Sequence, residues 1–555
     1  MRKLCFSIAV VVILWIGGVA HGASHYMSPT GTDSGSCTQS APCATFAYAF
    51  KQMAGGDTLY LANGTYTGSG NVISDQNEPP SGTSTSAMTT IVAQNIPCQN
   101  GVACNEPLLV TVGQGNGTEC STGGGLCYMN ASHVNYIKIQ GIYFRGMVQL
   151  MGTGAYDNTG GGKYWYFKQC AAEGDVDGNN TTWSLSSNPY GLLEDCIGFG
   201  KGRYKFLFYD QDRAGTPLYN VCRRCISRMD YDNDPGDPIA GFAVYYAHNT
   251  ALLNCIDIDG NLPTYWATDE LSGSFTQQVD DSSNIAMNVQ GSIALNTAYP
   301  VGYSQHAGVG GITFTDVAGI KAASGIYGGG ISNNRVTLVN MNTANFTYSS
   351  GEIANLDDAN NGFDYYSSGS PSQTLTNSIA ATIPSGSAAM GGWAASYLDY
   401  YGTGGLSGTA VSNAITTSPF TNGLLYPIRI ESGSTLATAG SGGGQVGANI
   451  TQTLGADGTF YGSTGYNTAT GTSLWPWPLE AWVKAQMAAM DTTITGSTMP
   501  SPTRGFCATG NGLYGGPITL TSYIWESLGN ALPSSVYGGS QTVLPAPTNL
   551  HIVTQ

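Results

Sequence analysis

A short apolar segment that ends in a cysteine recurs through the middle of the chain. Successive copies lie 26, 29 and 30 residues apart, and an apolar residue such as Phe167 or Leu193 stands three positions before the cysteine. The copies end at Cys170, Cys196, Cys225 and Cys255. A repeat of this length is typical of one solenoid coil, in which short strands are separated by turns. The pattern therefore predicts an all-β fold of stacked coils.

Equivalent positions of successive coils are expected to form ladders, because stacked strands lie about 4.8 Å apart. The four cysteines are then an internal ladder of small apolar side chains, and not metal ligands. The earlier segment 139–142 fits the same frame. Later segments fit it with less regular spacing, at 285–288, 336–340 and 375–379. We therefore expect the coils to occupy residues 24–460.

The pattern changes after residue 460. Residues 479–490 have the apolar spacing of an amphipathic helix, and 518–528 predict a second short helix. An uncovered last coil would offer an open sheet edge to other chains. We therefore expect 461–540 to form a small mixed helical cap at the C-terminal end. The remaining residues, 541–555, are either a polar tail or the start of a truncated module that resembles fibronectin type III.

The N-terminus has the pattern of a secretory signal peptide, which we place at residues 1–23. Arg2 and Lys3 precede a mostly apolar run at 4–16, and small residues follow at Ala20 and Gly22. The apolar run is shorter than the roughly 20 residues that a membrane-spanning helix needs. We therefore expect a secreted or cell-surface protein without a membrane span.

Three spaced motifs follow the signal segment, between residues 25 and 67. They have the forms Y-x-S-P-x-G-x-D, P-x-A-T-x-x-x-A and G-D-T-x-Y-L-x-x-G-x-Y, at 26–33, 42–49 and 56–66. This stretch resembles the opening of secreted pectate-lyase-like β-helix proteins, in which it forms the N-terminal cap and the first coil. The resemblance implies a right-handed parallel β-helix and makes a polysaccharide the expected partner.

Composition excludes other classes of protein. Only 10% of the 555 residues are charged, whereas a helical globular enzyme needs many more Glu, Lys and Arg residues on its helix faces. The formal net charge of −16 leaves no basic footprint for nucleic acid. We therefore expect no nucleic-acid partner.

Six of the 13 cysteines lie close together in pairs that flank short polar or glycine-rich stretches. Their spacing does not match a zinc knuckle, and it suits loop-stapling disulfides in an oxidising compartment. The expected pairs are Cys37 with Cys43, Cys98 with Cys104, and Cys120 with Cys127.

Charge is unevenly placed, since seven of the 19 basic residues fall between positions 201 and 228. In the coil alignment, three sets of residues alternate in sign on adjacent coils: Lys168/Glu194/Arg223, Asp175/Lys201/Asp230 and Asp177/Arg203/Asp232. Stacked opposite charges attract, so such ladders hold the coil register. We interpret the first set as a register device. For the other two sets a functional interpretation stays equally open, because they follow the strands in longer turns, where solenoids carry function.

These charges suit β-elimination on an acidic polysaccharide. The uronate carboxylate must be neutralised by Lys, Arg or a Ca²⁺ ion held by Asp, and a Lys or Arg of lowered pKa, or a Tyr, then removes the neighbouring proton. The expected catalytic residues are Lys201, Arg203, Lys205, Arg228, Asp230 and Asp232. The cofactor that this chemistry would use is calcium, and its expected ligands are Asp175, Asp177, Asp234 and Asp237.

Aromatic residues interleave with this charge cluster, and ring faces can stack on sugar rings. Tyr is unusually frequent, at 33 residues. The expected substrate-binding residues are Tyr204, Tyr209, Tyr231, Tyr245 and His248.

Two other functions stay open beside a polysaccharide lyase. Paired carboxylates such as Asp230 and Asp232 would suit a glycoside hydrolase. A non-catalytic, adhesive glycan-binding β-helix is the second alternative, because a fold does not fix a function.

Overall fold

The computed structural model describes most of the chain after residue 21, and all statements below concern the described residues. These are residues 22–118, 123–128, 133–151, 162–176, 180–210, 216–231, 239–260, 272–278, 287–304, 311–322, 325–328, 330–339, 373–383, 388–389, 393–402, 406–407, 411–492 and 500–537. Residues 1–21 of the predicted signal peptide and the tail at 541–555 lie outside them.

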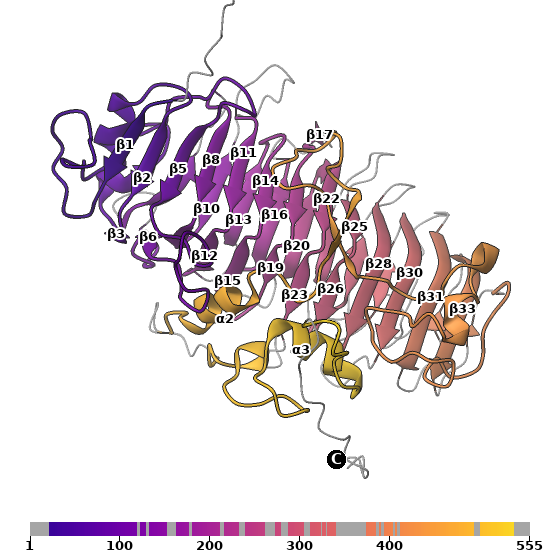
Figure 1. Cartoon of the computed structure of the whole chain (residues 1–555). Coiled ribbons are helices and arrows are strands. Elements are labelled where there is room, and N and C mark those ends of the chain that lie inside the picture. The colour runs from indigo at the N-terminus through magenta and orange to yellow at the C-terminus, as the bar shows by residue number, and fades with distance from the viewer. Residues whose placement is uncertain are drawn as a thin grey trace, which may run out of the picture.

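Successive coils build three sheets of parallel strands, which together form a parallel β-helix (Figure 1). Sheet 1 contains β1 (Ser24–Met27), β2 (Thr58–Leu61), β5 (Thr89–Ala93), β8 (Ile137–Gln140), β11 (Trp165–Lys168), β14 (Leu192–Glu194), β18 (Val221–Arg223), β22 (Thr250–Leu253) and β25 (Met287–Gln290). Sheet 2 contains β3 (Gly64–Tyr66), β6 (Val110–Val112), β9 (Ile142–Arg145), β12 (Ala171–Gly174), β15 (Ile197–Gly200), β19 (Ile226–Ser227), β23 (Ile256–Ile258) and β26 (Ile293–Leu295). Sheet 3 contains β4 (Val72–Ile73), β7 (Gly125–Tyr128), β10 (Val148–Met151), β13 (Thr181–Ser186), β16 (Tyr204–Tyr209), β20 (Ala240–Tyr245), β24 (Gly273–Gln278), β27 (Gly302–Ser304) and β29 (Ile326–Gly328).

Sheets 1 and 2 join towards the end of the solenoid, because β28 pairs with both β25 and β26. The long strands are β28 (Ile312–Ile320), β30 (Ile331–Val339), β31 (Gln373–Ile383) and β33 (Trp393–Gly402). Short strand pairs complete the β structure, with β17 (Thr216–Pro217), β21 (Ala247–His248), β32 (Ala388–Ala389), β34 (Leu406–Ser407), β35 (Gln452–Leu454) and β36 (Ala469–Ser473). The α-helices are α1 (Phe46–Ala49), α2 (Glu480–Ala488) and α3 (Leu520–Trp525), and the short 3-10 helix η10 (Glu526–Leu528) follows α3. No helix among the described residues has the length and apolarity needed to cross a membrane.

The corner between sheets 1 and 2 explains the cysteine repeat. One residue in the left-handed conformation turns the chain at Gln169, Asp195, Arg224 and Asn254, and the ladder cysteine follows each of them. The four cysteines are fully buried, and each thiol donates to a backbone carbonyl of the preceding coil. The predicted internal ladder of cysteines is therefore confirmed.

Two predicted disulfides are confirmed, between Cys37 and Cys43 and between Cys98 and Cys104. Cys127 is also disulfide-bonded. Its predicted partner, Cys120, lies outside the described residues.

The chain after β33 covers the end of the solenoid and then returns along its side. Ser412 and Ile415 pair with β33, so the last coil is covered by the residues that directly follow it. Residues 441–479, which we call the return strap, then run back along the corner of sheets 1 and 2 (Figure 1). Polar corner residues bind the strap backbone, since Asp316 accepts from Asn449 N at 3.0 Å and Asn254 from Leu454 N at 2.7 Å.

Of the segment 461–540, which we expected over the last coil, residues 461–479 belong to the return strap, and the rest packs along the flank of sheet 2 as far as it is described. Gln486 in α2 accepts from Leu108 N at 2.7 Å, and Asp259 accepts from Phe506 N at 3.0 Å. The predicted helices at 479–490 and 518–528 are present as α2 and as α3 with η10. Their apolar faces bury Trp482 and Trp525, which accounts for the amphipathic pattern.

Burial raises the pKa of several carboxyl groups, and the shift is large for three of them. Burial raises the pKa of Asp257 to about 6, of Asp399 to about 7 and of Glu173 to about 8. Asp399 lies in the last coil, where Asn422 Nδ2 donates to its Oδ2 at 3.2 Å. Each group therefore keeps its proton in the folded protein at pH values where an unfolded carboxyl has lost it.

We expect the protein to lose stability as the pH rises from about 5 to about 8. Unfolding releases the protons held by these groups, so the free energy of unfolding falls with increasing pH. The loss per group is at most about 1.4 kcal/mol for each unit by which its pKa is raised. Thermal unfolding across this range measures the slope. The Asp399→Asn protein should show a shallower slope, and identical slopes would contradict the assignment.

Candidate functional site

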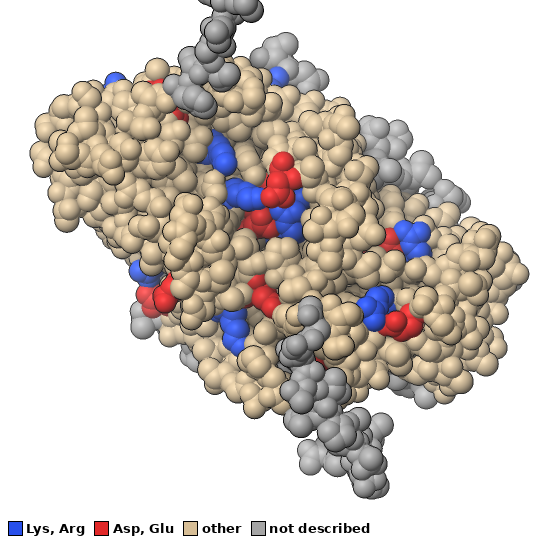
Figure 2. Space-filling model, viewed as in Figure 1, with Lys and Arg blue, Asp and Glu red and all other residues tan. Residues whose placement is uncertain are grey.

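A cleft of about 410 Å³ opens where the return strap crosses sheet 1 and its corner. We call it the charged cleft. Its charged lining residues are Lys168, Asp195, Arg224 and Asp457. Figure 2 shows the largest gathering of acidic and basic side chains in that view, in a hollow near the middle of the molecule. In a protein with so few charged residues, this concentration marks the cleft as the first candidate site.

Lys168 and Arg224 share the carboxylates of the charged cleft. Arg224 donates to Asp195 Oδ1 at 2.6 Å and to Asp457 Oδ1 at 2.8 Å. Lys168 Nζ donates to Asp457 Oδ2 at 2.7 Å and lies 3.3 Å from Asp195 Oδ2. Burial works against the charge of Lys168, but Asp195 and Glu194 outweigh it and raise its pKa. Both cations therefore stay charged beside the open side of the cleft, where the Asp457 side chain is 62% exposed.

Glu194 and Arg223 form the floor of the charged cleft and hold the strap in place. Both side chains are fully buried. Arg223 donates to the backbone carbonyls of Ala456, Thr459 and Tyr466, at 2.9 to 3.1 Å. Glu194 Oε1 accepts from Arg224 at 2.7 Å, and its Oε2 accepts from Tyr166 Oη and from Gly458 N. The pairing of Lys168 with Glu194 and of Glu194 with Arg223 confirms the predicted register ladder.

A larger groove of about 790 Å³ adjoins the charged cleft on the side of the first coils. We call it the hydroxyl-lined groove. Its walls carry Thr, Ser and Tyr hydroxyls and two aromatic rings close to the cleft, and the residues include Thr58, Tyr60, Thr83, Thr85, Ser86, Thr90, Lys138, Tyr166 and Phe460. Such a surface offers hydrogen bonds and ring faces, which are the contacts that sugars use.

Lys138 is the cation of the hydroxyl-lined groove. It lies in β8, next to Tyr166 of β11, and its Nζ is 5.3 Å from the centre of the Tyr166 ring. Among the described residues, no carboxylate lies within ion-pair distance of Lys138. Burial and the charge of Lys168 lower its pKa. Lys138 is therefore the basic side chain of the site that most readily gives up its proton.

Glu194, Asp195 and Asp457 bring carboxylate oxygens within 4.8 Å of one another, a spacing that a metal ion could use. The guanidinium of Arg224 already binds all three carboxylates. A Ca²⁺ ion prefers six to eight oxygen ligands and would have to displace Arg224 and Lys168. The donor set therefore does not fit calcium. Of the predicted calcium ligands, Asp175 accepts from Gly117 N at 2.7 Å, and Asp177, Asp234 and Asp237 lie outside the described residues.

Four predicted catalytic residues are buried in the β-helix or beneath the C-terminal segment. Lys205 Nζ donates to the carbonyls of Gly200, Lys201 and Gly202, and Lys201 is itself buried beside the Tyr231 ring. Arg228 and Asp230 pair at 3.0 Å and are fully buried beneath the C-terminal segment. All four side chains are fully buried.

The other predicted site residues lie around sheet 3. Arg203 stacks on the Tyr204 ring and donates to its hydroxyl at 2.7 Å, and Tyr209 stacks on Tyr245 with ring centres 5.1 Å apart. His248, in β21, is buried. Tyr231 pairs with Lys201, whereas the coil alignment placed Asp230 opposite it. The predicted partner Asp232 lies outside the described residues.

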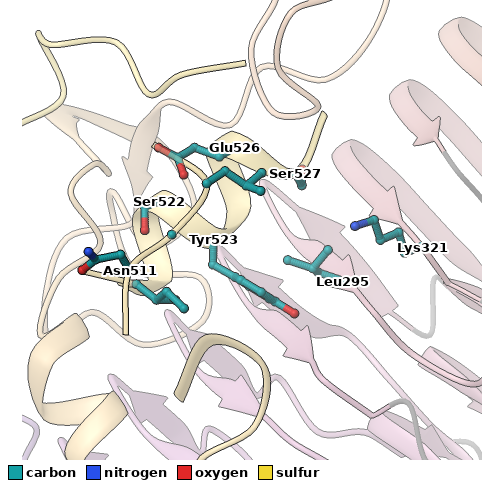
Figure 3. A pocket seen from close by; sticks show the side chains of 10 residues that line it. Leu295, Lys321, Asn511, Ser522, Tyr523, Glu526 and Ser527 are labelled. Atoms are coloured by element: carbon teal, nitrogen blue, oxygen red, sulfur yellow. The ribbon is translucent and has the colours of Figure 1, made fainter. Parts of the chain in front are cut away.

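A second cavity, of about 380 Å³, separates the α3–η10 segment from sheet 2 and the turns after it (Figure 3). Leu295 and Lys321 line it from the β-helix, and Ser522, Tyr523 and Glu526 from the C-terminal segment. The Tyr523 hydroxyl donates to Asp259 at 2.9 Å, which ties this wall to the β-helix. The lining is mostly apolar and brings few charged groups together, so the cavity is a weaker candidate.

Neither a protein-family model nor a curated protein matches the sequence. Several solved structures match this chain, among them the following three. A pectate lyase is 15% identical, with a TM-score of 0.38, over 78% of this chain and 96% of its own. A rhamnogalacturonan lyase is 16% identical, with a TM-score of 0.37, over 61% and 87%. A mannuronic acid specific polysaccharide family 6 lyase from human gut microbiota is 10% identical, with a TM-score of 0.40, over 70% and 78%.

The strand pairings themselves establish the parallel β-helix, so the expected resemblance to pectate-lyase-like β-helix proteins holds for the fold. At these identities the matched structures assign no residue of this chain to a reaction. The candidate site therefore rests on the chemistry of its own side chains.

Proposed function

We propose that the protein is a secreted lyase that cleaves an acidic polysaccharide by β-elimination in the charged cleft and the hydroxyl-lined groove. The observation that carries the proposal is the cation arrangement: Lys168 and Arg224 stand charged in the cleft, and Lys138, with a lowered pKa, stands in the adjoining groove. The signal-like N-terminus and the two disulfides support secretion.

The proposed reaction assigns a separate task to each cation. Lys168 and Arg224 neutralise the carboxylate of the bound sugar acid, which acidifies the hydrogen on the adjacent ring carbon. The neutral amine of Lys138 takes this proton, and its lowered pKa increases the fraction of free amine at a given pH. The electron pair forms a carbon–carbon double bond as the glycosidic carbon–oxygen bond breaks, and the leaving oxygen takes a proton from solvent.

Hydrolysis has less support from this site. A hydrolase needs one carboxyl group that stays protonated, with a raised pKa, to act on the leaving oxygen. Although partial burial opposes it, contacts with Glu194, Arg224 and Lys168 hold the pKa of Asp457 below its ordinary value. Asp230, the acid we expected in this role, is fully buried between Arg228 and Arg504.

Incubation with a panel of uronate polymers tests the proposal. We expect a rise in ultraviolet absorbance from the unsaturated product, on at least one polymer. The double variant Lys168→Ala/Arg224→Ala should lose this signal, whereas Lys51→Ala, which removes an exposed lysine far from the cleft in sequence, should keep it. New reducing ends without absorbance would instead indicate a hydrolase. Binding without any product would indicate a glycan-binding surface protein.

A further inference from the structure

Asp457 holds the place that the carboxylate of a ligand would take in the charged cleft. Its two oxygens bind two different cations, Oδ1 to Arg224 at 2.8 Å and Oδ2 to Lys168 at 2.7 Å. Both cations have further carboxylate partners below, in Glu194 and Asp195. Asp457 is thus the carboxylate of the ion-pair cluster that lies closest to solvent, and its side chain is 62% exposed.

The strap loop that carries Asp457 does not depend on this carboxylate for its position. Arg223 binds the carbonyls on both sides of it, at Ala456 and Thr459, and Glu194 accepts from Gly458 N at 3.0 Å. Phe460 packs in addition against Tyr164 and Tyr166. The Asp457 side chain can therefore leave Lys168 and Arg224 while the loop stays in place.

When Lys138 is protonated, the site carries two more positive charges than its buried acids neutralise. Lys138, Lys168, Arg223 and Arg224 carry four positive charges, and Glu194 and Asp195 carry two negative charges. Asp457 neutralises one of the two excess charges. When the Asp457 side chain rotates away, a planar carboxylate of the same size and charge can bind the same two donors. Lys168 and Arg224 are placed to bind one oxygen each of a planar carboxylate, and this placement suits a carboxylate better than a tetrahedral sulfate.

From this arrangement we infer that Asp457 is an internal competitor for the ligand, so that the charged cleft selects carboxylate-bearing sugars and binds them by exchange with the Asp457 side chain. The inference rests on the proposed function for the polysaccharide nature of the ligand. It adds a residue of this chain that competes with the sugar carboxylate and so sets the affinity. A sugar acid must displace Asp457 before Lys168 and Arg224 can hold it.

Titration calorimetry with a short oligo-uronate, on the wild type and on Asp457→Asn, tests the inference. Removing the competing charge should lower the dissociation constant about tenfold, with a larger effect at low salt. A neutral oligoglucan and a sulfated oligosaccharide of equal length should gain much less. Glu106→Gln, which removes one exposed negative charge elsewhere in the sequence, should leave the affinity unchanged.

The melting temperature of Asp457→Asn should stay within a few degrees of the wild type, because Arg223 holds the loop. Asp457→Ser should bind as tightly as Asp457→Asn. Unchanged or weaker uronate binding by both variants would overturn the inference, and so would an equal gain for the sulfated ligand. If the wild type cleaves uronate polymers but the variants do not bind the oligo-uronate more tightly, only the inference about Asp457 fails, and the proposed lyase activity is retained. If the variants bind the oligo-uronate more tightly but no uronate polymer is cleaved, only the proposed lyase activity fails, and the inference about Asp457 is retained.

Discussion

Replacing Lys138 by alanine should lower the rate of polymer cleavage by about 100-fold to 10,000-fold, the range that a general base contributes. Lys138 is the basic side chain of the site that lacks a carboxylate partner among the described residues and has a lowered pKa, so its amine is the group able to take the proton. Initial rates of product absorbance at saturating polymer measure the effect. The binding of an oligo-uronate should change much less, because Lys168 and Arg224 remain.

A matched substitution separates base chemistry from charge. In Lys138→Arg the guanidinium stays protonated at accessible pH, so the positive charge is kept but no neutral base is available. This variant should therefore bind the polymer and still fail to cleave it. The wild-type rate should rise with pH, as the fraction of neutral Lys138 increases. A Lys138→Arg protein with near-normal rates would contradict the assignment of Lys138 as the base.

Removing Glu194 should destabilise the protein by about 3–5 kcal/mol, the usual cost of leaving a buried ion pair without one partner. Glu194 is fully buried and binds Arg224 at 2.7 Å, with Arg223 and Lys168 at 3.6 and 3.5 Å. Its loss leaves Arg223 in the interior without a direct counter-charge. Chemical denaturation of Glu194→Ala measures the change in the free energy of unfolding.

Glu431 provides the surface counterpart for this measurement. It pairs with Arg429 while about a third of its side chain is exposed, so Glu431→Ala should cost only about 0–1 kcal/mol. Glu194→Gln, which keeps the hydrogen-bonding shape without the charge, should fall between the two. Equal costs for Glu194→Ala and Glu431→Ala would show that the buried cluster does not hold the strap.

The solenoid could be predicted because its signal is local. Four successive coils repeat a strand, a left-handed corner residue and a buried cysteine, so the alignment of Cys170, Cys196, Cys225 and Cys255 contains the period directly. The same alignment placed Lys168, Glu194 and Arg223 on one ladder. It did not show that this ladder forms the floor of a cleft.

The site itself depends on contacts that the coil repeat does not contain. Asp457 reaches Lys168 across 289 positions of sequence, because the return strap docks on the polar corner residues. Lys138 is a single lysine without a motif, and its distinction is its position beside Tyr166 in the groove. The one available signal was the pair of polar corner residues Asn254 and Asp316, which accept hydrogen bonds from the strap backbone.

The sequence interpretation expected the charges of Lys201, Lys205, Arg228 and Asp230 at a surface, and the structure buries all four side chains. Charged residues are rare in this protein, so a cluster of them suggested a surface. Lys205 instead caps three inward carbonyls, and Arg228 with Asp230 anchors the C-terminal segment on the β-helix. A buried charge with full hydrogen bonding has the same sequence pattern as an exposed one.

A crystal structure of the Lys138→Ala protein with a bound oligo-uronate tests the central claim most directly. We predict that the sugar lies across the charged cleft and the hydroxyl-lined groove, with one carboxylate within hydrogen-bond distance of both Lys168 and Arg224 and with Asp457 turned away. An oligosaccharide bound elsewhere, such as on sheet 3 beside Tyr209 and Tyr245, with Asp457 still paired to Lys168, would contradict it.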